Sequence, residues 1–174
     1  MTILRVIVAT DSSMGIARKD IIPWSVKEDM MFFRKHTRNG FLIFGRKTWE
    51  NVSSFGKKCL LHEGNRRVII VSSAKGCASS LDDAIQMCSS EPWRNIIICG
   101  GVNLYKEALG YPNVILYYTH VYGNYECDVF FPSGWEKEMY LFDEVKTDEC
   151  SMQTWVKNIT ALPLPHHLLP RART

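Results

Sequence analysis

The sequence lacks the features of membrane proteins and of secreted, disulfide-bonded proteins. Among its 174 residues, no run approaches the ~18 consecutive apolar residues that a transmembrane helix needs. Its first residues lack the basic start and the apolar centre of a secretory signal. None of the six cysteines forms a C-x-x-C pair, and no group of His and Cys has the spacing of zinc ligands. We therefore expect free thiols, no bound metal, no membrane association and a cytoplasmic location.

An excess of charge of one sign is also missing. The 21 Lys and Arg residues face 18 Asp and Glu residues, and the basic residues form no run. The charge therefore gives no reason to expect binding to nucleic acid. An apolar content of 46% with five tryptophans argues against intrinsic disorder, and 174 residues fit one domain.

Short and nearly continuous apolar runs alternate with segments of helical periodicity. Apolar runs of this length are typical of strands that are covered on both faces, as in a parallel sheet. The expected strands are residues 3–10, 41–45, 68–73, 95–100 and 114–121. The expected helices are residues 26–37, 81–89 and the segment that contains Val102, Tyr105 and Leu109.

Two further segments complete the predicted organisation. Residues 138–159 have the pattern of an antiparallel hairpin with its turn at 146–149. Residues 160–174 hold three of the seven prolines, a density that prevents helix and sheet. We predict one α/β domain with a mainly parallel sheet over residues 1–159, and an extended or disordered proline-rich tail over residues 160–174.

The helix expected at 26–37 carries the acidic residue of most interest. Its apolar side chains Val26, Met30 and Phe33 recur at helical spacing and define one face. Asp29 lies about 60° from the centre of that face on a helical wheel. It could cap a turn or pair with Arg34. In a cleft, its carboxylate would instead pair with a heterocycle that presents two N–H groups, and desolvation would raise its pKa.

Glycines follow two of the expected strands. Gly100-Gly101 joins a buried strand directly to a helix, and Gly45 precedes Arg46, Lys47 and Thr48 in the same way. Each segment could be a simple strand-to-helix turn. Glycine also lets the backbone approach a ligand closely, and ligands of open α/β sheets bind at the carboxyl ends of the strands. Residues 11–23, which precede Trp24, have no regular pattern and could form a binding loop.

Seven of these motifs occur in the order found in dihydrofolate reductases. They are IVATDSSMGIARKDIIPW, Asp29 with Phe33, GRKTWE, VIIVSS, IICGG, YYTHV and CDVFFP, and the match as a whole runs from residue 3 to about residue 159. The chain therefore resembles that family. The resemblance implies a mixed sheet of eight strands flanked by four helices. It also implies a monomeric enzyme that reduces 7,8-dihydrofolate with NADPH and so supplies tetrahydrofolate for one-carbon metabolism.

The resemblance also assigns roles to individual residues. It implies catalytic roles for Asp29, Trp24 and Thr119. The substrate-binding residues that it implies are Ile7, Val8, Asp29, Phe33, Val52, Arg66 and Thr119. The cofactor-binding residues that it implies are Ala9, Gly15, Ile16, Ile22, Arg46, Lys47, Thr48, Ser72, Ser73, Cys99, Gly100, Gly101, Val102, Asn103, Leu104 and Tyr105. In this family a cis peptide usually joins the two glycines, which is rare without proline.

Some alternatives remain open at this stage. The segment between Trp49 and Arg66 is longer than is usual in the family and lacks a proline–leucine pair, so Arg67, Lys57 or Lys58 could take the role of Arg66. A reductase of the same fold that acts on a riboflavin-pathway pyrimidine is a second reading of the whole chain. A non-catalytic folate- or nucleotide-binding module is a third.

Overall fold

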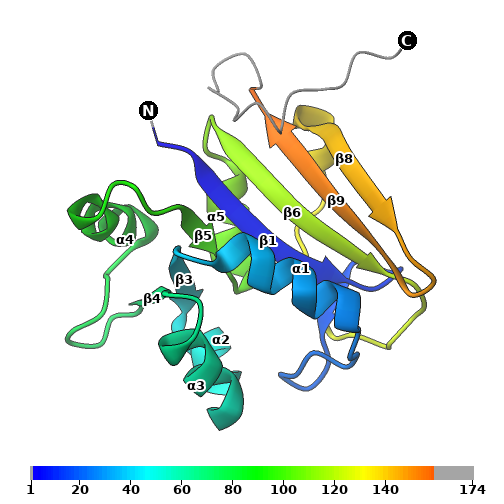
Figure 1. Cartoon of the computed structure of the whole chain (residues 1–174), viewed down its shortest axis with the longest axis horizontal. Helices are drawn as coiled ribbons and strands as arrows, with labels where there is room; N and C mark the ends of the chain where they lie inside the picture. Colours follow the sequence, from blue (N-terminus) through cyan, green and yellow to red (C-terminus); the bar gives the residue numbers. More distant parts are fainter. Residues whose placement is uncertain (1, 159–174) are drawn as a thin grey trace.

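The computed structural model describes residues 2–158 (Figure 1). The strands are β1 (Leu4–Thr10), β2 (Gly15–Ala17), β3 (Phe41–Gly45), β4 (Arg67–Val71), β5 (Ile96–Ile98), β6 (Val114–Val121), β7 (Val129–Phe130), β8 (Tyr140–Lys146) and β9 (Cys150–Lys157). The α-helices are α1 (Lys27–Thr37), α2 (Arg46–Asn51), α3 (Ser54–His62), α4 (Leu81–Met87) and α5 (Val102–Leu109). Two 3₁₀ turns, η1 (Cys88–Ser90) and η2 (Trp135–Glu138), complete the described elements.

Seven strands form the main sheet, in the order β4-β3-β5-β1-β6-β9-β8. The strands from β4 to β6 in this order are parallel, whereas β9 runs antiparallel to both β6 and β8. Strands β2 and β7 form a separate antiparallel ribbon. The carboxyl ends of β4, β3, β5 and β1 therefore meet at one edge of the main sheet.

Helices cover both faces of this sheet, and each face has its own apolar core. On one face lie α1, α2 and α3 (Figure 1). They pack on side chains that include Ile7, Leu42 and Tyr117. On the other face, α4 and α5 pack on side chains that include Val6 and Leu116. Adjacent residues of a strand point to opposite faces, so these continuous apolar runs fill both cores.

The α/β fold, the mainly parallel sheet and the C-terminal hairpin are confirmed. Strands β3 and β6 have the predicted bounds, and the hairpin of β8 and β9 turns at the predicted position. The resemblance implied eight strands in one sheet. The described residues have seven strands in the main sheet, two more in the ribbon, and five α-helices. All six cysteines are free, as predicted.

The predicted apolar face of α1 is wrong at Met30. This side chain is 49% exposed, whereas Phe32 and Phe33 pack against the core and Thr37 is fully buried. The helix is therefore rotated relative to the expected face. The expectation for residues 160–174 lies outside the described residues. No helix within residues 2–158 combines the length and the apolar character that crossing a membrane requires.

Candidate active site

Loops that follow four neighbouring parallel strands meet at one edge of the sheet. Ser72 and Ser73 follow β4, Arg46 begins α2 directly after β3, and Gly100-Gly101 follows β5. Asp11 follows β1 in the same position. Because open α/β sheets bind ligands at this edge, the topology brings the predicted phosphate and ribose contacts to a favourable place.

The backbone at Gly100-Gly101 lies against the loop after β3. A cis peptide joins the two glycines, and the Gly45 N–H donates to the Gly100 carbonyl at 2.7 Å. A Cβ atom at Gly101 would stand 2.9 Å from Thr48 Oγ1, so only glycine fits there without a shift. Tyr105, one turn into α5, is buried and donates its hydroxyl to the Ile7 carbonyl at 2.9 Å.

The other predicted cofactor-binding residues differ in burial and in the side of the sheet on which they pack. Cys99 packs on the core below α1, whereas Leu104 packs on the opposite core. Val102 is partly buried and Asn103 is exposed on the first turn of α5. Lys47 is exposed and pairs with Asp20 at 3.5 Å.

Asp29 and Thr119 face each other beside β1. Asp29 stands in the first turn of α1, and Thr119 pairs in register with Ala9 of β1. Burial raises the pKa of Asp29, and the nearby Thr119 hydroxyl offsets part of this rise. The two groups lie outside normal hydrogen-bond geometry, so Thr119 Oγ1 is buried and has no hydrogen-bond partner in the part of the chain that the structure describes.

Trp24 provides a second unsatisfied polar atom near this place. Its ring packs with Ala9 and Val26 and meets Tyr125 edge to face at 5.4 Å. Its buried Nε1 has no hydrogen-bond partner among the described residues. Because buried polar groups are nearly always paired in native proteins, unpaired atoms at Trp24 and Thr119 indicate a place for a polar ligand or water.

Three of the four apolar residues predicted to contact the substrate lie on one side of the sheet. Ile7, Phe33 and Val52 belong to the same core on the α1 side of the sheet. Val8 belongs to the core on the opposite face, since it alternates with Ile7 along β1. Only the backbone of Val8 can therefore contribute on the side of Asp29.

Arg66 is buried and rigidly held, at 7% exposure. Its Nε donates to Thr37 Oγ1 at 3.0 Å, and its other nitrogens donate to the carbonyls of Glu63 at 2.9 Å and Arg34 at 3.3 Å. No carboxylate within residues 2–158 pairs with it. A guanidinium has five N–H donors, so two remain for an anion. Arg67, in contrast, is exposed and pairs with Glu91 at 3.3 Å.

The irregular segment between β1 and α1 contains the short strand β2 and is fastened at its base. The Asp11 carboxylate accepts N–H groups of Ser13, Gly15 and Tyr125 at 2.8–3.0 Å. Burial tends to raise the pKa of Asp11, but these donors outweigh it and the pKa is lowered. Of the predicted loop contacts, Gly15 is buried, Ile16 packs on the core and Ile22 is 64% exposed.

Sequence reasoning missed two residues of this arrangement. Thr37 positions Arg66, and its only signal was a hydroxyl at the last residue of the helix that carries Asp29. Asp11 fastens the loop, and its signal was a carboxylate directly after a buried strand.

Comparison with known proteins gives one family. The family model described as "Dihydrofolate reductase" matches residues 3–158. A dihydrofolate reductase of Schistosoma mansoni is 34% identical over 155 residues, covering 77% of this chain and 81% of that protein. One from Bacillus subtilis is 32% identical over 141 residues, covering 75% of this chain and 78% of that protein.

A solved structure gives the same result for the fold. The structure of Schistosoma mansoni dihydrofolate reductase superposes with a TM-score of 0.69 at 27% sequence identity. The match covers 90% of this chain and 97% of that chain.

Proposed function

The chain belongs to the dihydrofolate reductase family, and we propose that it reduces 7,8-dihydrofolate to tetrahydrofolate with NADPH as the cofactor. The net reaction adds a hydride to C6 of the substrate and a proton to N5. The observation that carries the proposal is the desolvated carboxylate of Asp29, with the unpaired groups of Thr119 and Trp24 beside it.

Asp29 binds and orients the pterin in this proposal. Its carboxylate accepts two N–H groups of the pterin face, and charge-assisted pairs of this kind are roughly twice as strong as neutral hydrogen bonds. The Thr119 hydroxyl supports the carboxylate from β6. The side chains of Ile7, Phe33 and Val52 supply the apolar surface for the rings.

The same carboxylate favours protonation of N5. A negative charge held in a poorly solvated place raises the proton affinity of a nearby base. The free Nε1–H of Trp24 holds a water beside the pterin, which gives the proton a short path.

Arg66 binds the far end of the substrate. Its two remaining N–H donors match the two oxygens of a carboxylate. Its burial and its bonds to Thr37 and to two carbonyls fix the direction of the guanidinium before substrate arrives. Arg67, Lys57 and Lys58 are the weaker candidates, since Arg67 is already paired with Glu91.

The residues at the sheet edge fit a dinucleotide with phosphates. A Cβ atom at Gly101 would crowd Thr48 Oγ1, Arg46 and Thr48 lie in the first turn of α2 directly after β3, and Ser73 lies two residues after β4. When bound, NADPH supplies the hydride. The segment with Gly15, Ile16 and Ile22 excludes water from this region. The ion pair between Lys47 and Asp20 holds this segment near α2.

One assay tests the proposal. Mixing the protein with NADPH and 7,8-dihydrofolate should lower the absorbance at 340 nm, and the Asp29→Asn variant at neutral pH serves as the matched control. A folded protein that leaves the absorbance unchanged would contradict the proposal and favour a non-catalytic module. Oxidation of NADPH with a riboflavin-pathway pyrimidine, but not with dihydrofolate, would favour the second reading. A single species of about 20 kDa in sedimentation would support the proposed monomer.

A further inference from the structure

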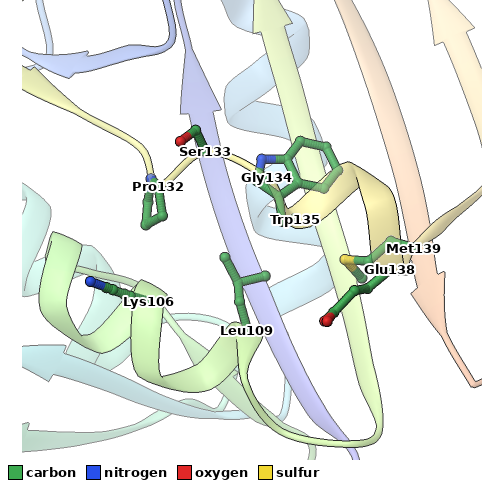
Figure 2. Close-up of a pocket in the computed structure, with 8 residues that line it drawn as sticks. All are labelled: Lys106, Leu109, Pro132, Ser133, Gly134, Trp135, Glu138 and Met139. Carbon is green, nitrogen blue, oxygen red and sulfur yellow. The ribbon is translucent and has the colours of Figure 1, made fainter.

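A cavity lies on the face of the sheet opposite Asp29. It has a volume of about 220 Å³ and opens between α5 and the segment that contains η2 (Figure 2). Leu109 of α5 forms one wall, and Pro132, Trp135 and Met139 form the other. Leu109, Trp135 and Met139 belong to the core below α5, so this cavity is separate from the proposed folate site.

Trp135 places an unsatisfied donor at this cavity. The side chain is 8% exposed, and its buried Nε1 has no hydrogen-bond partner within residues 2–158. The ring meets Trp155 edge to face at 5.1 Å and packs in a tilted arrangement against Tyr118 at 5.4 Å. Figure 2 shows the indole nitrogen on the side of Ser133. An unpaired buried N–H costs free energy, so this position favours a carbonyl acceptor.

The described chain ends beside the same cavity. Lys157 donates to the Leu109 carbonyl at 3.1 Å and pairs with Glu138 at 2.8 Å, and both of these residues line the cavity. The Asn158 side chain donates to the Pro112 carbonyl. Residues 159–174 therefore begin next to the cavity. Four extended residues span roughly 13 Å, which is enough to bring Leu162 to its wall.

The sequence that follows has the chemistry of a ligand for such a surface. Residues 162–165 read Leu-Pro-Leu-Pro. Proline has no N–H, and a polyproline II segment leaves its carbonyls free to accept from outside. Grooves lined by aromatic side chains bind proline-rich segments in this conformation.

We propose that residues 162–165 of the chain's own C-terminal segment dock in this cavity. The Trp135 Nε1–H donates to a backbone carbonyl of the segment, and the leucines contact Leu109 and Met139. The occupant is the same molecule rather than a second copy, because the segment starts at the cavity rim. Docking on this face leaves turnover unchanged, since the residues proposed for the reaction lie elsewhere.

Nuclear magnetic resonance of the tryptophan indole N–H groups tests this in the full-length chain. The Trp135 signal is assigned by its loss in the Trp135→Phe variant. If that variant does not fold, the signal is assigned by nuclear Overhauser effects between Trp135 and Trp155. Leu162→Asp with Leu164→Asp should move this signal and speed its hydrogen exchange about tenfold or more. The matched control, Leu168→Asp with Leu169→Asp, adds the same charge outside the docked residues and should leave the signal unchanged. Trp93, at 74% exposure, is the internal reference.

Three results would overturn the proposal. The Trp135 indole N–H could exchange as fast as that of Trp93 in the wild-type protein. The two pairs of variants could have the same effect. The third is a signal that shifts with protein concentration, which would assign the occupant to a second copy of the chain.

Discussion

Arg66 donates from Nε to the hydroxyl of Thr37, 3.0 Å away, and so ties the segment before β4 to the last residue of α1. Asp29 stands in the first turn of the same helix. One rigid element thus connects the two charged groups that we propose for the two ends of the substrate.

Replacing Arg66 should weaken substrate binding without slowing the chemical step. A charge-assisted fork to a carboxylate is worth roughly 1.5–3 kcal/mol, and it acts equally in the ground state and the transition state. Arg66→Leu should therefore raise the KM for dihydrofolate by about one to two orders of magnitude with little change in kcat.

The neighbouring residue provides the control for this measurement. Arg67→Leu removes an exposed side chain that pairs with Glu91, and it should leave the KM near that of wild type. A dihydropterin without a glutamate tail should not distinguish Arg66→Leu from wild type. A raised KM in Arg67→Leu alone would move the carboxylate site to Arg67.

Asp29→Asn should remove most of the activity at neutral pH. The amide keeps the shape of the side chain but offers no negative charge, and general acid–base groups typically contribute ~10²–10⁴-fold. Activity should recover partly at lower pH, where substrate is protonated in solution, and NADPH binding should be nearly intact. Wild-type turnover at pH 7.5 would refute the role of Asp29.

The same variant should not lose stability at neutral pH. Burial raises the pKa of Asp29, so the ionised carboxylate destabilises the folded state once the pH exceeds the unfolded pKa. The Tm of Asp29→Asn should thus equal or exceed that of wild type at pH 7.5 and converge with it in acid. This separates loss of catalysis from loss of folding.

Gly101→Val should impair cofactor binding more than folate binding. The new Cβ atom would meet Thr48 Oγ1 at 2.9 Å and fill the space proposed for the phosphates. We expect the Kd for NADPH to rise by roughly tenfold or more, an increase equivalent to about 1.4 kcal/mol. Gly110→Ala, at the other end of α5, is the control. An unchanged Kd for NADPH would refute the phosphate site.

NADPH should be preferred over NADH. Arg46 and Ser73 follow strands β3 and β4, which are paired up to Gly45 and Val71, and we expect both side chains to contact a 2′-phosphate at this edge. Within residues 2–158, Arg46 pairs only with the exposed Glu50, a contact worth little in stability. Arg46→Ala should reduce the ratio of the two kcat/KM values by about tenfold. Equal kcat/KM values for NADPH and NADH in the wild-type enzyme would contradict this prediction.

His36 should make the fold sensitive to acid. Its ring stacks on Tyr117 at 3.9 Å, and burial with the charges of Lys35 and Arg5 lowers its pKa to about 4 from 6.5. Between these values the unfolded state binds more protons, so the free energy of unfolding falls as the pH falls. His36→Phe should flatten the Tm between pH 6.5 and 4, whereas the exposed His62→Gln should not.

The sequence predicted the strands well because their signal is local. Residues 41–45 and 114–121 are apolar runs that need only cover on both faces, and β3 and β6 have those bounds. Helix α3 was missed because Gly56 and two lysines interrupt its apolar periodicity. Its one clear signal was Ser53, whose hydroxyl accepts from the Gly56 N–H at 3.0 Å.

Features that depend on distant contacts could not be predicted in the same way. The β2–β7 ribbon joins segments of three and two residues, which are too short for any periodic pattern. The rotation of α1 that exposes Met30 is set by packing against Tyr117 of β6. The pairing of Arg66 with Thr37 likewise exists only after β4 and α1 are assembled.

The length of α1 has a consequence for which substrates the enzyme accepts. Asp29 and Thr37 are two turns apart in one helix, and a rise of ~1.5 Å per residue separates them by about 12 Å along its axis. The helix therefore fixes the distance between the residue that binds the heterocycle and the residue that positions the carboxylate-binding Arg66. A substrate with a shorter or longer spacer could satisfy one end only, so the spacing of these two positions along the helix selects substrates by length.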